Sequence, residues 1–235
     1  MEHGARLEGR SLIWLSVWTA VFGVTMGFFE AAVVVYLNRL QALGELAFSP
    51  QGRPGVLLVT EVLREAASLG MICAVACLSA RGLVPRLAQA GIIFGLWDVF
   101  YYVFLRLLIG FPATPLTWDV LFLIPRPWLG PVLAPVLVSA ALVACGFHAL
   151  WAERCGREIR PAAWHWALGL AGGLVVVLSF TIGTPADFTG TNFPSRFRWE
   201  VFLPGLTAGL AAYLAAIRRG AARPAAPQRR TSDLG

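Results

Sequence analysis

Long apolar runs alternate along the chain with short polar or charged segments. Six runs reach the roughly 20 apolar residues that a helix needs to cross the hydrocarbon core of a bilayer. They cover residues 11–37, 56–78, 87–109, 128–151, 162–182 and 200–217. The pattern predicts an all-α polytopic membrane protein, with a bundle of six transmembrane helices in one domain over residues 1–217.

Composition strengthens this interpretation. Hydrophobic residues make up 57% of the chain and charged residues 14%, with a mean hydropathy of +0.69. Soluble domains carry about 25% charged residues, so a soluble globule, a coiled coil, a disordered chain and a disulfide-rich scaffold are excluded. Small residues let membrane helices approach closely. We expect such contacts at Gly23, Gly27, Gly169, Gly172 and Gly173.

The basic residues predict the orientation. All 19 are arginines. Twelve lie on one side of the predicted bundle, five lie on the other, and Arg64 and Arg106 fall within the spans. Because basic loops stay in the cytoplasm, both termini are predicted to be cytoplasmic. No basic face or recognition motif indicates nucleic acid as a partner. Residues 218–235 are rich in Arg, Ala and Pro, which predicts a disordered basic tail on the anionic lipids of the cytoplasmic surface.

Several ionisable residues fall inside the first three predicted spans. They are Glu30 in the first, Glu61, Arg64 and Glu65 in the second, and Asp98 and Arg106 in the third. Glu61 and Glu65 are one helical turn apart, and Asp98 shares a helix face with Tyr101 and Tyr102. A charge that faces lipid costs a few kcal/mol or more at the centre of a helix. These faces should therefore turn inward and surround a polar cavity open to the outside.

The segment over residues 110–130 is apolar but too short to cross the membrane twice. Thr117 can cap a short helix, and the prolines that follow would end it. We expect an interfacial or re-entrant half-helix, either lying plainly in the interface or covering the cavity. In the second case it would bring Asp119 and Arg126 to the mouth of the cavity.

These residues form the candidate set for ligand binding or proton titration: Glu30, Glu61, Arg64, Glu65, Asp98, Tyr101, Tyr102, Arg106, Asp119 and Arg126. Their pattern is equally compatible with ion pairs that tie the helices together, because buried pairs also fix helix register. The two tyrosines are more typical of interface aromatics than of catalytic phenols. Inside the spans the carboxylates outnumber the arginines, so protons, a cation, water or loop arginines must balance the excess.

Two histidines raise the question of a cofactor. His148 ends the fourth predicted span and His165 begins the fifth, so both lie on the cytoplasmic side, away from the carboxylates. Two such histidines can hold a haem, and His with Cys155 can hold a metal ion. Flanking tryptophans at 164 and 166 instead favour an interfacial belt. The cofactor therefore stays unknown, no metal site is assigned, and no disulfide is expected of the four cysteines.

Three stretches resemble known bacterial proteins. They read Phe-Gly-Leu-Trp-Asp-Val-Phe-Tyr-Tyr at 94–102, Trp-Asp-Val-Leu-Phe-Leu-Ile-Pro at 118–125 and Gly-Pro-Val-Leu-Ala-Pro-Val at 130–136. The chain here is similar to bacterial multi-pass membrane proteins of uncharacterised function. This resemblance implies a bacterial inner (plasma) membrane location. It does not point to any particular activity.

Three classes of function follow from the pattern. The first is binding or transport of a small solute, ion or lipid headgroup in an outward-facing ionic cavity. The second is a membrane-embedded enzyme that acts on a lipid-linked substrate at the outer leaflet, with carboxylates as acid, base or metal ligands. The third is a structural or assembly subunit of a membrane complex. The sequence leaves open whether the chain forms a homo-oligomer.

Overall fold

The computed structural model describes residues 2–42, 54–124, 126–157, 159–185 and 193–221. Within these ranges it contains six helices: α1 (Glu2–Ala42), α2 (Pro54–Ser79), α3 (Leu83–Ile109), α4 (Leu133–Arg154), α5 (Ala163–Thr181) and α6 (Trp199–Ala221). All six are long and apolar enough to cross a membrane, which confirms the predicted all-α fold. The chain is therefore a multi-pass integral membrane protein.

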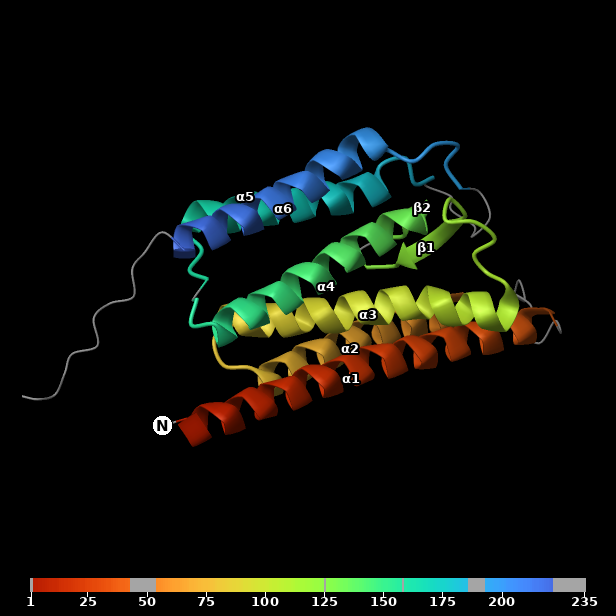
Figure 1. The fold of residues 1–235 in the computed structure, drawn as a ribbon. Coiled ribbons are helices and arrows are strands. Elements are labelled where there is room, and N and C mark those ends of the chain that lie inside the picture. Colours follow the sequence, from red (N-terminus) through yellow and green to blue (C-terminus); the bar gives the residue numbers. More distant parts are fainter. Residues whose placement is uncertain (1, 43–53, 125, 158, 186–192, 222–235) are drawn as a thin grey trace, which may run out of the picture.

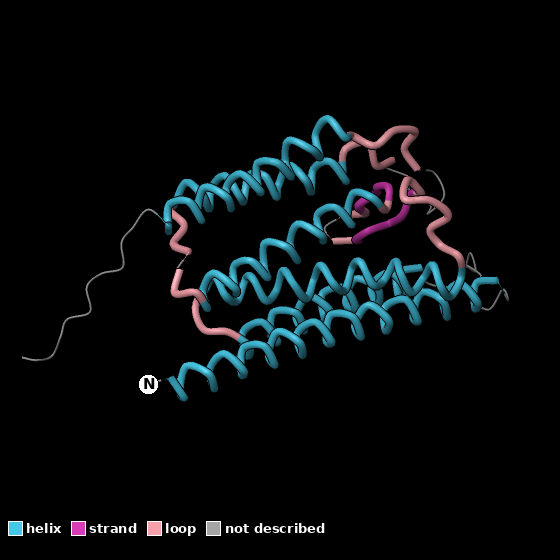
Figure 2. The backbone as a smooth tube through the Cα atoms, in the orientation of Figure 1, coloured by secondary structure: helices cyan, strands magenta, loops and turns pink. Residues whose placement is uncertain are grey.

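The helices form two groups that run in nearly the same direction (Figure 1). In the first group α3 packs against α1, α2 and α4, and in the second α5 and α6 pack against each other. The start of α1 and the end of α6 lie at the same end of the bundle, here called the terminal end (Figure 1). The opposite end, here called the hairpin end, holds the only two strands among the described residues (Figure 2).

Close approaches at glycines hold the helices together. A Cβ atom added to Gly27 of α1 would lie 2.8 Å from the Trp97 carbonyl oxygen of α3, and one on Gly95 would lie 2.5 Å from the Ser139 oxygen of α4. Gly172 meets the Gly205 oxygen at 2.7 Å in the same way. Backbones can approach this closely only where no side chain intervenes.

The predicted glycine contacts are confirmed in part. Gly23, Gly27 and Gly172 sit at close helix contacts, as expected. Gly173 does not, because a Cβ atom there would meet nothing within 4 Å. Gly169 has only Ala212 Cβ near this limit, at 3.9 Å. The last two glycines therefore border open space rather than another backbone.

The segment after α3 forms a β-hairpin, so the predicted half-helix is wrong. Strand β1 (Trp118–Phe122) pairs antiparallel with β2 (Trp128–Pro131). Aromatic and β-branched residues favour a strand here. Thr117 ends a turn instead of capping a helix, since its Oγ1 accepts the Thr114 N–H at 3.0 Å. The fourth predicted span consequently begins too early, because α4 starts only at Leu133.

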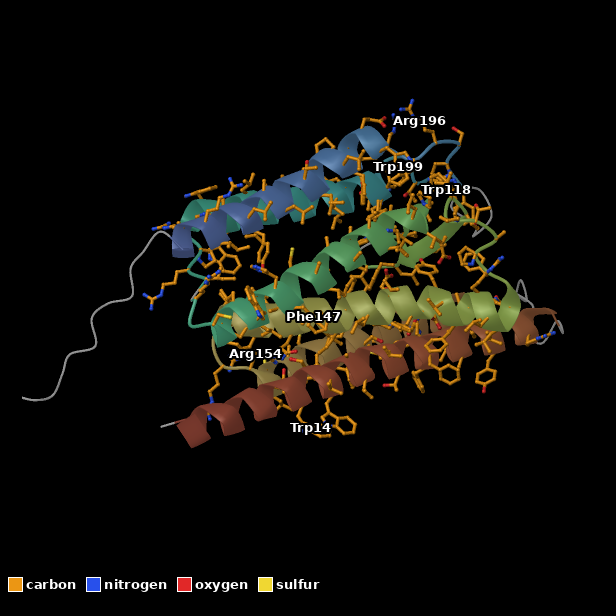
Figure 3. All side chains as sticks on the ribbon, viewed as in Figure 1. Trp14, Trp118, Phe147, Arg154, Arg196 and Trp199 are labelled. Atoms are coloured by element: carbon orange, nitrogen blue, oxygen red, sulfur yellow. The ribbon has the colours of Figure 1, made fainter. Side chains whose placement is uncertain are left out.

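Aromatic packing connects the hairpin to the second helix group. Phe180 of α5 stacks on Trp128 of β2, with ring centroids 6.2 Å apart. Phe197 contacts both Phe180 and Trp118, at 5.5 and 6.2 Å. Trp118 and Trp199 accordingly gather at the hairpin end (Figure 3). This cluster holds α5 and α6 beside the hairpin.

The arginines divide between the two ends as the sequence indicates. Arg154 lies at the terminal end and Arg196 at the hairpin end (Figure 3). Helix α6 continues through Arg218 and Arg219 to Ala221, so the predicted tail starts in a helix. The rest of that tail, residues 222–235, lies outside the described residues. The cytoplasmic placement of the terminal end remains a prediction from the positive-inside rule.

Gly95 should be intolerant of a side chain. Gly95→Ala would push its methyl group against the Ser139 carbonyl and separate α3 from α4. Such overpacking costs about 1–3 kcal/mol, so the thermal unfolding midpoint of the purified protein should fall by several degrees. Gly70→Ala is the matched control, because nothing lies within 4 Å of that position. Equal midpoints for the two variants would contradict the close contact.

Orientation can be measured with one native and one introduced thiol. Cys155 is exposed and follows α4 at the terminal end, whereas Arg126 is exposed at the hairpin end. If the terminal end is cytoplasmic, a membrane-impermeant maleimide should label Arg126→Cys in intact cells and Cys155 only after permeabilisation. Labelling of Cys155 in intact cells would reverse the orientation. A background in which all four native cysteines are replaced by serine isolates the introduced thiol, because Cys73 and Cys77 are exposed as well.

Candidate functional site

A cavity of about 260 Å³ lies between α1, α2, α3 and β1. Eight of the ten candidate residues line it: Glu30, Glu61, Arg64, Glu65, Asp98, Tyr101, Tyr102 and Asp119. Residues far apart in the sequence thus share one polar space, as the helix-face argument expects. We call this space the acidic cavity.

Arg64 lies between two carboxylates of the acidic cavity. Its guanidinium forms an ion pair with Glu30 across the α1–α2 interface. Its Nε and Nη2 atoms also lie 2.9 and 2.8 Å from Oε2 of Glu61, one turn away on α2. The charge of Arg64 is therefore already shared by two partners within the protein.

Glu65 joins α2 to the hairpin. Both of its carboxylate oxygens accept the backbone N–H of Leu123, at 3.0 and 3.2 Å. This N–H follows the last residue of β1 and would otherwise lack a partner from the ladder. Since Glu65 is only 8% exposed, the contact is shielded from solvent and brings the hairpin over the acidic cavity.

Asp119 lies in β1 and faces α3. Its Oδ2 accepts a hydrogen bond from the Tyr102 hydroxyl at 3.0 Å, and its Oδ1 accepts one from the Val120 N–H at 2.9 Å. Burial raises the pKa of the Asp119 carboxyl to about 6, although both hydrogen bonds act to lower it. This carboxyl is therefore ionised at neutral pH and becomes neutral in mild acid.

Asp98 lines the acidic cavity and connects α3 to α4. Its Oδ2 accepts a hydrogen bond from the Ser139 hydroxyl of α4 at 2.8 Å. Next to it, Trp97 is 7% exposed, and its indole N–H has no hydrogen-bond partner among the described residues. A buried donor without a partner costs free energy that a bound acceptor can recover.

Two candidate residues, Arg106 and Arg126, do not line the acidic cavity. Arg106 donates to the carbonyl oxygens of Gly110 and Pro112, at 2.7 and 2.8 Å, and so closes the end of α3. It follows Asp98 by eight residues, which at 100° per residue places it about 80° round the helix from that face. Arg126 is exposed near the hairpin turn and does not line the acidic cavity.

The sequence reasoning missed several lining residues. Val120, Leu121 and Phe122 are consecutive, yet all three line the acidic cavity. An irregular register between Val120 and Phe122 explains this, because a bulge breaks the alternation of a strand. Ser139 was also missed, although a serine within an apolar helix is a visible signal of a polar partner.

His148 and His165 each have a partner of their own. Nδ1 of His148 lies 2.8 Å from the Tyr213 hydroxyl, and Nδ1 of His165 accepts the Ala162 N–H at 2.8 Å. The second contact caps the start of α5. Over the described ranges, no three His, Cys, Asp or Glu side chains are grouped closely enough to hold a metal ion.

The lining of the acidic cavity contains far more acidic than basic side chains. Five carboxylates line it, and Arg64 is the only basic side chain among its described lining residues. Trp97, Tyr101, Tyr102 and Phe122 add aromatic rings to the same walls. Carboxylates and aromatic faces both attract cations, so the arrangement is suited to a positively charged ligand.

Comparison with known proteins supplies no relative from which to transfer a function. No known protein family, curated protein or solved structure matches the chain. The resemblance to bacterial multi-pass proteins, and the inner-membrane location that it implies, remain predictions. The function is therefore argued from the geometry of the acidic cavity.

The hydrogen bond from Tyr102 should hold down the pKa of Asp119. Tyr102→Phe removes this donor, so the pKa of Asp119 should rise by about one unit above its value near 6. Infrared titration of the carboxyl stretch, assigned with Asp119→Asn, measures the change. Tyr101→Phe is the control, since that ring contacts Tyr102 in an edge-to-face arrangement without a hydrogen bond to Asp119 in the structure. Equal shifts in both variants would refute the assignment.

Proposed function

We propose that the acidic cavity binds a small solute that carries an ammonium group, and that it opens on the outer side of the membrane. The observation that carries this proposal is the charge of the lining, with five carboxylates around Arg64. The outward direction follows from the arginine distribution. Binding of a cation is thus favoured over binding of an anion.

The partners of the carboxylates support the proposal. Glu30 and Glu61 share the charge of Arg64. Within the described part of the chain, the other three acids accept hydrogen bonds from neutral groups only. A backbone amide or a hydroxyl stabilises a carboxylate without cancelling its charge. A bound ammonium group would supply that missing positive charge, because attraction between charges is strong away from water.

The size and the aromatic walls narrow the class of ligand. A volume of about 260 Å³ lies just below the range for pockets of drug-sized ligands, which fits a small solute or a headgroup. Trp97, Tyr101 and Tyr102 present rings beside the carboxylates. Ammonium groups bind over such rings through cation–π attraction. A small ligand with a protonated primary amine or a quaternary ammonium group meets these requirements of size and charge.

One set of contacts favours the structural alternative. Glu65 links α2 to the hairpin, Asp119 links the hairpin to α3, and Asp98 links α3 to α4. Acids that only tie elements together would matter for stability and not for a ligand. Binding and stability must therefore be measured on the same variants.

Ethanolamine is a suitable probe for the proposed site. The purified protein should bind it in calorimetric titrations, and Asp119→Asn should weaken binding at least tenfold because one carboxylate charge is lost. Glu200→Gln is the matched control, since Glu200 lies at the same end but outside the acidic cavity, paired with Arg196. Acetate should not bind.

The same titration has a defined pH dependence. With the pKa of Asp119 near 6, its carboxyl is about nine-tenths ionised at pH 7 and about nine-tenths neutral at pH 5. Ethanolamine affinity should therefore fall from pH 7 to pH 5. It should fall less in Asp119→Asn, where the remaining pH dependence comes from the other acids that line the same space, Glu65 and Asp98 among them. No binding at pH 7, with a lowered unfolding midpoint for Asp119→Asn, would favour the structural alternative.

A further inference from the structure

A second and larger cavity lies beside the acidic cavity. Its volume is about 550 Å³, and it separates α3, α4 and the hairpin from α5 and α6. Almost all of its lining is apolar, including Phe94, Trp128, Val138 and Leu206, with Gly173 and Gly209 on the side of α5 and α6. We call it the apolar crevice.

The apolar crevice and the acidic cavity share a wall. Asp98, Leu121 and Phe122 line both spaces. A ligand that occupies both would therefore place one end among carboxylates and the other end among apolar side chains. This continuity points to an amphipathic molecule rather than to two unrelated ligands.

The depth of the apolar crevice matches one leaflet of a bilayer. On α4 its lining runs from Pro135, two residues after the start of the helix, to Cys145. Ten residues of helix rise about 15 Å, which is half of the roughly 30 Å hydrocarbon core. The crevice thus covers the leaflet at the hairpin end, where the acidic cavity also lies.

Glycines keep the crevice open. Gly172 and Gly205 bring α5 and α6 into close contact with each other, whereas a Cβ atom on Gly173 or Gly209 would meet nothing within 4 Å. The α5–α6 pair touches α4 and β2 far less than its own members touch each other. Space beside these two glycines is therefore bounded by helices but not filled by their side chains.

Two indole N–H groups along this path have no partner. Trp97 lines the acidic cavity and Trp128 lines the apolar crevice, and Nε1 of each is buried without a hydrogen bond among the described residues. A phosphate ester carries acceptor oxygens next to the ammonium group and the acyl chain of a phospholipid. Such oxygens would satisfy the donors.

We propose that the ligand of the acidic cavity is a phospholipid with an ammonium headgroup, whose acyl chain lies in the apolar crevice. The proposal rests on the proposed function, because the headgroup occupies the same carboxylate-lined space. The inference adds the class of ligand, which is a lipid of the phosphatidylethanolamine type from the leaflet at the hairpin end. The lipid reaches its site from within the bilayer, between α4 and the α5–α6 pair.

Three probes separate the parts of this ligand. Lysophosphatidylethanolamine carries the headgroup and one chain, ethanolamine carries the amine alone, and lysophosphatidylglycerol carries the chain and phosphate without the ammonium group. We expect the purified protein in detergent to bind lysophosphatidylethanolamine at least tenfold more tightly than either of the other two. Native mass spectrometry, with calorimetry for ethanolamine, measures the three affinities.

Variants then assign the chain to the apolar crevice. Gly173→Leu and Gly209→Leu fill the crevice without a backbone clash, so each should weaken lysophosphatidylethanolamine binding at least tenfold and leave ethanolamine binding within twofold. Gly70→Leu is the matched control, since Gly70 also meets open space but lines neither cavity. It should change neither affinity. Asp119→Asn should weaken both.

The outcomes distinguish the two proposals. If ethanolamine binds in a manner that depends on Asp119 but the lysolipid binds no tighter, the lipid inference is wrong and the cation site stands. Unchanged lysolipid affinity in both crevice variants also overturns the inference. If ethanolamine does not bind, or lysophosphatidylglycerol binds as tightly as lysophosphatidylethanolamine, the carboxylates do not select an ammonium group and the proposed function itself fails.

Discussion

The carboxylate of Glu65 and the backbone N–H of Leu123 form the contact on which the acidic cavity depends. A short hairpin beside apolar helices leaves N–H groups that need acceptors, and Glu65 is an acceptor strong enough to position one of them. The bond places β1 across the first three helices, so that Asp119 and Phe122 become walls of the cavity.

Two kinds of packing divide the molecule. In the first group, the ion pair of Arg64 with Glu30 joins α2 to α1. The hydrogen bond from Ser139 to Asp98 joins α4 to α3, in addition to the close contact at Gly95. In the α5–α6 pair, Gly172 approaches Gly205, and aromatic rings pack near the hairpin. The Tyr213 hydroxyl of α6 also donates to the Cys145 carbonyl oxygen of α4 and lies 2.8 Å from Nδ1 of His148. Because the acidic side chains of the cavity belong to the first group and the hairpin, the boundary between the groups has carboxylates on one side and apolar surface on the other. That contrast is what makes the shared wall at Asp98 amphipathic.

The sequence predicts those features that depend on local spacing. Apolar run length was enough for six helices, and the 3.6-residue period was enough to bring Asp98 and Tyr102 to one face. The hairpin was not predictable in this way, because a short apolar stretch fits a strand or a helix equally well and the acceptor that fixes it, Glu65, is distant in sequence. Arg106 does not share the helix face of Asp98, because eight residues exceed two full helical turns and so rotate Arg106 away from that face. The apolar crevice depends on the distance between helix pairs, which no local pattern encodes.

The order of the ion-pair partners along the chain bears on how the protein is made. Glu30 and Arg64 belong to consecutive helices, so they can meet as soon as α2 joins α1 in the membrane, and the pair enters the lipid with its charges compensated. Glu65 and Asp98 differ, because their partners Leu123 and Ser139 are synthesised later. During biogenesis these two acids must stay protonated or hydrated until the hairpin and α4 arrive. Insertion of the first three helices is therefore completed by residues that follow them.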